Sequence, residues 1–307
     1  MHRSIGRRPS RWSGRRGWLG WLAVTLLLLG GLAPLAAAAR GSRPQVVGGA
    51  PVKQGALPFM AFLEASDANG ALFNCGGTLI APRFVLTAAH CTQLVGEPVL
   101  PPSAFWIGIG QVNEGKFKAK NAFGVVAVTQ DPGWNPQPDA EGNITDFRYD
   151  VAILELDRDV PRKLAQPIAV VAGGDGEFDG AGQPIVVSGW GLTSDRGQPS
   201  TRLRAANIDV ASDADCDALH FVVFDPATMI CAGMPGRSSC QGDSGGPIFA
   251  HAADRQPVEI GIASWSDDPC DASINGFVRL SNPDINAFIT QVAGVAGARS
   301  GKHRGAR

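Results

Sequence analysis

Several signatures of metal-binding and repeat proteins are absent from this sequence. It has no Cys-x-x-Cys and no pair of histidines at helical separation, so no zinc site is predicted. There is no internal repeat, no low-complexity tract longer than a few residues, and no Gly/Ser linker that would divide the chain. The sequence therefore predicts one compact unit, or two packed together, with no metal ion or other cofactor.

Acidic side chains are absent from the first 39 residues. This segment contains six arginines, then an apolar run over 18–29, then the small-residue stretch APLAAAAR. Basic, apolar and small-residue parts in this order are typical of a secretory signal peptide. We expect a signal peptide over 1–39 and a short propeptide over 40–45, with the mature protein secreted or periplasmic. An uncleaved membrane anchor is the alternative, because 18–39 is about long enough to span a bilayer.

The charge of the chain is unevenly distributed. Residues 46–297 carry all 28 acidic residues and 15 of the 27 basic ones, a net charge of −13. Such a segment repels nucleic acid, so no nucleic-acid partner is expected. Residues 298–307 are basic and are predicted to form a disordered tail.

Six cysteines in an exported chain indicate disulfides rather than metal ligands. Their number allows 15 connectivities, and spacing alone does not choose among them. Pairing of nearest neighbours would close three short loops, each worth roughly 3 kcal/mol in the chain-entropy model. Those pairs are Cys75–Cys91, Cys216–Cys231 and Cys240–Cys270.

Most of the secondary-structure signals are those of strands. Short segments rich in Val, Ile and Phe, bounded by Gly, Pro, Asn or Asp, predict an all-β barrel or sandwich. They lie at 59–64, 76–89, 105–110, 123–130, 151–157, 184–191, 203–211, 247–250, 258–265 and 276–280. Helices are predicted over 212–220, capped by Ser212, and over 281–295, with Asn282 before a proline.

Three side chains are candidates for catalysis. Ser244 lies between Asp243 and a glycine pair, His90 ends an apolar strand beside a cysteine, and Asp150 precedes another strand. Each also has a purely structural interpretation, as a turn residue or a buried histidine. His220 and His251 are expected on the surface and His303 in the tail.

The three candidates belong to motifs that occur together. Thr-Ala-Ala-His-Cys, Asp-Val-Ala-Ile-Leu and Gly-Asp-Ser-Gly-Gly-Pro, in this order, strongly resemble the trypsin/chymotrypsin family of serine endopeptidases. Further matches lie at 46–49, 75–80, 188–191, 229–233 and 264–266. The resemblance implies a protease domain over 46–297, built from two six-stranded antiparallel β-barrels with a C-terminal helix. It also implies the nearest-neighbour cysteine pairing and an active site in the cleft between the barrels.

The resemblance assigns roles to the catalytic residues. Ser244 would be the nucleophile, His90 its general base, and Asp150 the group that fixes the imidazole tautomer. The backbone N–H groups of Gly242 and Ser244 would form the oxyanion hole. Ser264 is expected to hydrogen-bond Asp150 and to line the substrate channel.

Specificity would be set by the pocket for P1, the residue on the N-terminal side of the cleaved bond. By the family pattern Ser238 forms its floor, and the remaining wall residues would be Ser239, Ser264, Trp265, Ser266 and Gly276. An uncharged floor disfavours Arg and Lys, so a medium to large apolar or aromatic P1 is predicted. Asp267, Asp268 and Asp271 at the rim favour the opposite choice, a basic P1, if they are more than solvated loop residues.

The resemblance also implies activation by cleavage between Gln45 and Val46, after which the new α-amino group pairs with Asp243. Partners would be protein or peptide substrates and protein inhibitors, with no stable membrane anchor after signal cleavage, and the protein would be a monomer.

Some members of the family bind a structural calcium ion through two glutamates of an outer loop. The corresponding segment here, 110–120, is rich in lysine, so no structural calcium is predicted. A non-catalytic binding or adhesion protein on the same fold is the alternative, though such proteins usually lack one of the three catalytic residues. A lipase would instead need Gly-x-Ser-x-Gly at a strand-to-helix turn.

Overall fold

The computed structural model describes residues 46–299, except for 68, 137, 141, 220–221, 267–268 and 271–273. Several predictions lie outside the described residues: the signal peptide 1–39, the propeptide 40–45, most of the tail 298–307, His220, and the rim residues Asp267, Asp268 and Asp271.

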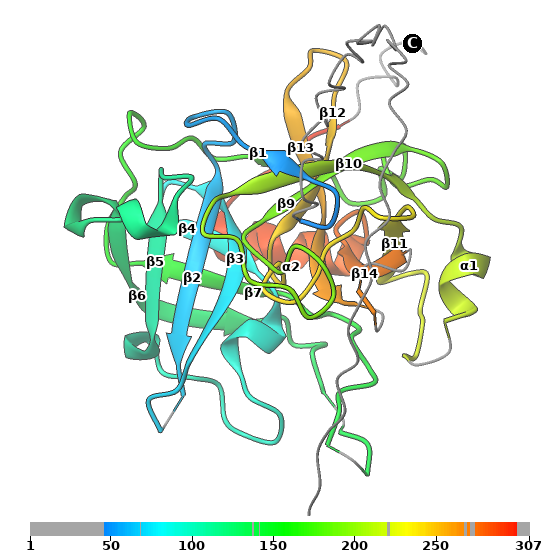
Figure 1. Ribbon diagram of the computed structural model, residues 1–307, viewed down its shortest axis with the longest axis horizontal. Helices are drawn as coiled ribbons and strands as arrows, with labels where there is room; N and C mark the ends of the chain where they lie inside the picture. The colour runs from blue at the N-terminus through cyan, green and yellow to red at the C-terminus, as the bar shows by residue number, and fades with distance from the viewer. Residues whose placement is uncertain are drawn as a thin grey trace, which may run out of the picture. The chain divides into compact units, whose positions relative to one another are not determined.

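The first half of the described chain forms a closed antiparallel barrel. Its strands are β2 (Met60–Ser66), β3 (Leu72–Ala81), β4 (Phe84–Thr87), β5 (Phe105–Ile109), β6 (Ala122–Gln130) and β7 (Ala152–Leu156). They pair in the order β2-β3-β4-β7-β6-β5, so β4 and β7 lie side by side although they are distant in sequence (Figure 1).

The second half forms another six-stranded barrel. Its strands are β9 (Pro184–Gly189), β10 (Arg204–Val210), β11 (Met229–Gly233), β12 (Pro247–His251), β13 (Pro257–Trp265) and β14 (Ile274–Arg279). The order β10-β11-β14-β13-β12-β9 is closed by pairing of β9 with β10, and the short β1 (Ala50–Pro51) and β8 (Ala169–Val170) attach to β10 and β13. The predicted pair of six-stranded antiparallel barrels is confirmed.

Both predicted helices are present. In α1 (Asp213–Asp217) the cap Ser212 accepts a hydrogen bond from the N–H of Asp215. In α2 (Pro283–Ala293) the side chain of Asn282 accepts from two backbone N–H groups of the first turn. These side chains satisfy N–H groups that have no partner within the helix. Short 3-10 helices are η1 (Ala89–Thr92), η2 (Pro102–Ala104), η3 (Glu114–Lys116) and η4 (Ala119–Asn121).

The structure corrects two strand predictions. The segment 76–89 is not one strand, because β3 ends at Ala81 and β4 begins at Phe84. Pro82, with a fixed φ and no N–H, is well suited to the turn between them. Strand β11 was missed because its five residues are all buried, which leaves no alternation of polar and apolar side chains to read.

The two barrels meet closely beside β3 and β12. The rings of Phe59 and Phe249 pack edge to face with centroids 5.5 Å apart. The N–H of Gly76 donates to the carbonyl oxygen of Ser244 over 2.7 Å. A Cβ at Gly76 would lie 2.9 Å from the backbone of Gly246, so only glycine allows this approach. The barrel contact therefore fixes the position of the turn that carries Ser244.

Candidate active site

The pairing of β4 with β7 brings His90 next to Asp150. Thr87, the last residue of β4, is the partner of Ala152, the first residue of β7. His90 follows β4 in η1, and Asp150 precedes β7 by two residues. Because the strands are antiparallel, the end of one and the start of the other lie at the same edge of the barrel.

Asp150 is fully buried and holds His90 through two hydrogen bonds. The backbone N–H of His90 donates to Oδ1 over 2.8 Å, and the ring Nδ1 lies 2.7 Å from Oδ2. Burial lowers the pKa of His90, but the charge and hydrogen bond of Asp150 outweigh it and raise the pKa above its ordinary 6.5. Nε2 lies on the other side of the ring, where its recorded contact is with Cys91, and among the described residues no hydrogen bond joins it to Ser244.

The second barrel supplies a third bond to the same carboxylate. Ser264, on β13, donates its hydroxyl to Oδ2 of Asp150 over 2.6 Å, as the sequence predicts. Ser244 lies just before β12, whose first residue Pro247 pairs with Ile262 of β13. The two serines therefore come from neighbouring strand ends at the barrel contact.

A tight turn over 240–246 presents Ser244. Gly242 and Gly245 have φ of +91° and +77°, a region that favours glycine. The carboxylate of Asp243 accepts from the N–H groups of Gly191 and Cys240, at 2.8 and 3.0 Å. Among the described residues, no hydrogen bond uses the N–H of Gly242 or Ser244 as donor. Two donors on one turn are thus open to a ligand.

His90 and Ser244 line the same cavity, which has a volume of about 450 Å³. Ile144 and Phe147 form an apolar side, and the ring of Phe147 lies perpendicular to that of His90 with centroids 6.3 Å apart. Sequence reasoning missed Phe147, although an aromatic residue three positions before a candidate acid was a signal for it.

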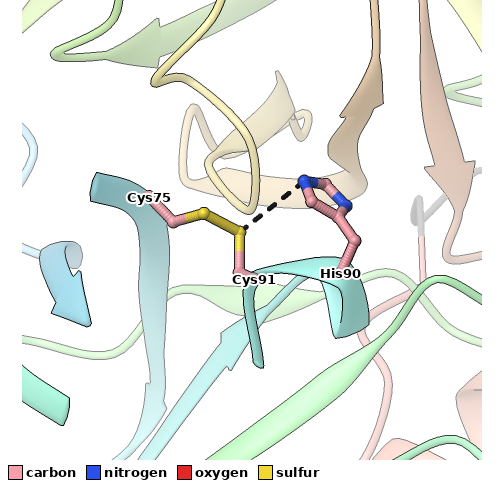
Figure 2. A group of neighbouring side chains, drawn as sticks. All are labelled: Cys75, His90 and Cys91. Atoms are coloured by element: carbon pink, nitrogen blue, oxygen red, sulfur yellow. Dashed lines mark hydrogen bonds between the residues drawn. A yellow bond between two sulfur atoms is a disulfide. The ribbon is translucent and has the colours of Figure 1, made fainter. Parts of the chain in front are cut away.

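The sulfur atoms beside His90 are not metal ligands. Figure 2 shows Cys75 bonded to Cys91, with Sγ of Cys91 3.8 Å from Nε2 of His90. A disulfide sulfur lacks the negative charge of the thiolate that binds zinc. The bridge fixes η1, which carries His90, to strand β3. The two other predicted bridges, Cys216–Cys231 and Cys240–Cys270, are also present.

Comparison with known proteins agrees with this geometry. The pattern of the family described as Trypsin matches residues 46–289. The chain belongs to the trypsin family. A trypsin of Simulium vittatum is 34% identical over 72% of this chain and 82% of its own length. A chymotrypsin of Phaedon cochleariae is 28% identical over 78% of this chain and 79% of its own.

Some relatives are much longer than the matching part. Serine protease 56 of Mus musculus is 31% identical over 73% of this chain, but the match covers only 34% of that protein. The trypsin-family chain described here thus spans about a third of that relative, and the similarity concerns the two barrels.

The expected substrate-binding residues of this trypsin-family chain divide into two groups. Ser239, Ser264, Trp265 and Ser266 line the cavity beside Ser244. Ser238 is fully buried and outside the lining, with its hydroxyl donated to the carbonyl oxygen of Cys270 over 2.6 Å. Gly276 is outside it as well, and a Cβ there would lie 1.8 Å from the ring of Trp265.

Asn275 is a residue of this pocket region that the sequence reasoning did not consider. It is buried, and its Nδ2 donates to the carbonyl oxygen of Ser239 over 2.5 Å. Nothing in the local sequence distinguishes it from a surface loop residue, because its partner lies 36 positions away.

The two residues assigned to activation are both fully buried. Burial raises the pKa of Asp243 to about 7, against the two backbone hydrogen bonds that lower it. Val46 has φ of +33°, and the next residue, Val47, forms an isolated bridge with Ser238. The start of the described chain therefore lies against the segment that leads to Asp243.

Proposed function

We propose that this trypsin-family protein hydrolyses peptide bonds by attack of Ser244 Oγ on the scissile carbonyl carbon. His90 Nε2 accepts the serine proton and later protonates the leaving amine, and Asp150 stabilises the imidazolium. Water then hydrolyses the acyl-enzyme. The observation that carries the proposal is the bond from Asp150 to His90 in the cavity that Ser244 lines.

The N–H groups of Gly242 and Ser244 are proposed as the oxyanion hole. Neither is used as a donor among the described hydrogen bonds, and both belong to the turn over 240–246. Donors held in place before the reaction stabilise the charge that develops on the carbonyl oxygen.

Substrates are proteins or peptides, with an uncharged, apolar P1 preferred to Arg or Lys. The proposal is supported by the absence of an acidic side chain at Ser238 and Ser239. The charged group of a P1 Arg or Lys would be buried near these serines without an anionic partner, which is strongly unfavourable.

Cleavage after Gln45 is proposed to switch the enzyme on. The freed α-amino group of Val46 would pair with Asp243 and hold the turn over 240–246. In the uncleaved chain, the described hydrogen-bond donors to Asp243 are two backbone N–H groups. They lower its pKa, but burial outweighs them and raises the pKa to about 7.

Export is proposed to precede this step. The signal-like segment 1–39 and three disulfides fit an oxidising compartment. In the part of the chain that the structure describes, neither helix has the length and apolar character needed to cross a membrane.

Replacement of the serine tests the mechanism. Ser244→Ala should lower kcat by about 10⁴-fold or more and abolish labelling by a serine-directed organophosphate, with the fold unchanged. His90→Ala should lose activity in the same way, and His251→Ala is its matched control, because His251 is exposed on β12 and should tolerate the change. Near-normal turnover by Ser244→Ala, with contaminating protease excluded, would show that another residue is the nucleophile.

A further inference from the structure

Ser238 and Asn275 are both buried and both outside the lining of the cavity, so Ser239 marks the inner end of that lining. Ser239, which lines the cavity, is only 4% exposed, and Ser238 behind it is 0% exposed. Asn275, which donates to Ser239, is 1% exposed. A side chain that enters the cavity along Ser239 therefore does not reach Ser238 unless something moves.

The direction of the Asn275 side chain follows from the strand that carries it. Asn275 and Gly276 are consecutive in β14, so their side-chain positions point to opposite faces. The position of a Cβ on Gly276 is occupied by the ring of Trp265. Asn275 accordingly points the other way, toward the turn that carries Ser238 and Ser239.

The amide of Asn275 joins two walls of this pocket. Nδ2 lies 2.5 Å from the carbonyl oxygen of Ser239 and 3.3 Å from that of Cys270. Ser238 Oγ donates to the same Cys270 oxygen, and the disulfide Cys240–Cys270 ties the walls together nearby. Displacing the amide would leave buried polar groups without partners, which is unfavourable.

We propose that Asn275 determines specificity by closing the inner end of the P1 pocket, so that this enzyme prefers peptides with a short uncharged P1 such as Ala, Val or Thr. The proposal rests on the proposed serine-protease function and narrows its substrate class. An uncharged floor alone is compatible with the medium to large P1 predicted from the sequence, but the closed inner end is not. Phe and Tyr would have to displace Asn275 to bind.

The test compares kcat/KM for peptide substrates that differ only at P1, with Ala, Val, Leu, Phe and Arg. With the active protein, Ala or Val should exceed Phe by tenfold or more. Asn275→Gly, which removes the amide, should shift the Phe-to-Ala ratio toward Phe by tenfold or more. Asn207→Gly is the matched control, because Asn207 is exposed on β10 and lines a different cavity, and it should leave the ratio unchanged.

The outcomes separate this proposal from the one on which it rests. If the active protein prefers Phe over Ala by tenfold, or if Asn275→Gly leaves the ratio unchanged, the role of Asn275 is refuted while the mechanism stands. If no peptide is cleaved and Ser244 is not labelled, the proposed function itself fails. Should Asn275→Gly not fold, Asn275→Ser replaces it. A tenfold preference of the unaltered protein for Phe over Ala would refute the proposal without either variant.

Discussion

At the scale of single residues, Asp150 combines two effects on His90. It orients the ring through Nδ1 and raises the pKa against the opposing effect of burial. Both effects come from one carboxylate that is itself held by Ser264. The imidazole must be neutral to act as a base, so activity should fall at acid pH as His90 gains its proton.

Asp150→Asn is expected to lower kcat by about 10⁴-fold, because the amide favours the wrong tautomer of His90. The remaining activity of this variant should also fall off at a lower acid pH than that of the unaltered enzyme. The reason is that the charge that raises the pKa of His90 is gone while the burial that lowers it remains. The measurement is kcat/KM from pH 5 to 9. Asp254→Asn, on an exposed loop, is the control, and an unmoved acid limb in Asp150→Asn would contradict this account.

Glu259 is another buried acid, remote from the proposed chemistry. It lies on β13, and its Oε2 accepts a hydrogen bond of 2.7 Å from Thr78 of the other barrel. Oε1 is buried with no hydrogen-bond partner among the described residues. Burial raises the pKa of Glu259 from 4.5 to about 8, against the bond from Thr78. The folded protein therefore holds this proton where the unfolded chain has lost it.

This difference in pKa predicts how stability depends on pH. Between about pH 4.5 and 8 the unfolded chain binds fewer protons than the folded one, so the free energy of unfolding should decrease as pH rises. The slope from this group is at most about 1.4 kcal/mol per pH unit. Glu259→Gln should remove this contribution and leave that of Asp243, whose pKa is also raised, as measured by urea unfolding in the Ser244→Ala background. Glu97 is exposed, so Glu97→Gln should keep the full pH dependence of the free energy of unfolding. Equal slopes in the two variants would show that Glu259 is not the source of the dependence.

At the scale of elements, the approach of the chain to β7 is strained. Tyr149, which directly precedes Asp150, has φ of +58°, a region that costs a residue other than glycine about 1–3 kcal/mol. Its ring lies against Gly133 in the turn after β6, where a Cβ would be 2.6 Å from the ring. The turn thus packs on the residue that sets the position of Asp150.

Gly133→Ala should displace Tyr149 and lower kcat by about tenfold, with a shift of the acid limb, because a ~1.4 kcal/mol disturbance changes a rate by that factor. Tyr149→Gly added to it should restore activity, since glycine adopts the same φ without the ring. Gly180→Ala is the control, with no atom within 4 Å of its added Cβ. A double variant no better than Gly133→Ala would rule out the proposed contact.

At the scale of the whole molecule, activation should link the chain terminus to the active site. A protein that begins at Arg40 should be nearly inactive, and one that begins at Val46 active. Pairing with Asp243 would raise the pKa of the new α-amino group above its ordinary 7.7–8.0, so activity should be lost only as pH rises beyond that range. N-terminal sequencing of the active enzyme tests this directly. A start at another residue would refute the pairing.

The sequence by itself determined the family, the two-barrel fold and the order of the three candidate catalytic residues. These follow from short motifs and turn signals that involve neighbouring residues, such as the glycines around Ser244 and the caps Ser212 and Asn282. The cysteine pairing followed from the resemblance, because spacing alone left it open.

Only the tertiary structure decided which side chains reach the cavity. Ser238 and Asn275 are remote in sequence, and their burial depends on how β14 faces the turn before Ser244. The contact of Tyr149 with Gly133 and that of Glu259 with Thr78 likewise join separate segments. Successive side chains of a strand point to opposite faces, so whether Asn275 or Gly276 faces this turn depends on how β14 packs against the neighbouring elements.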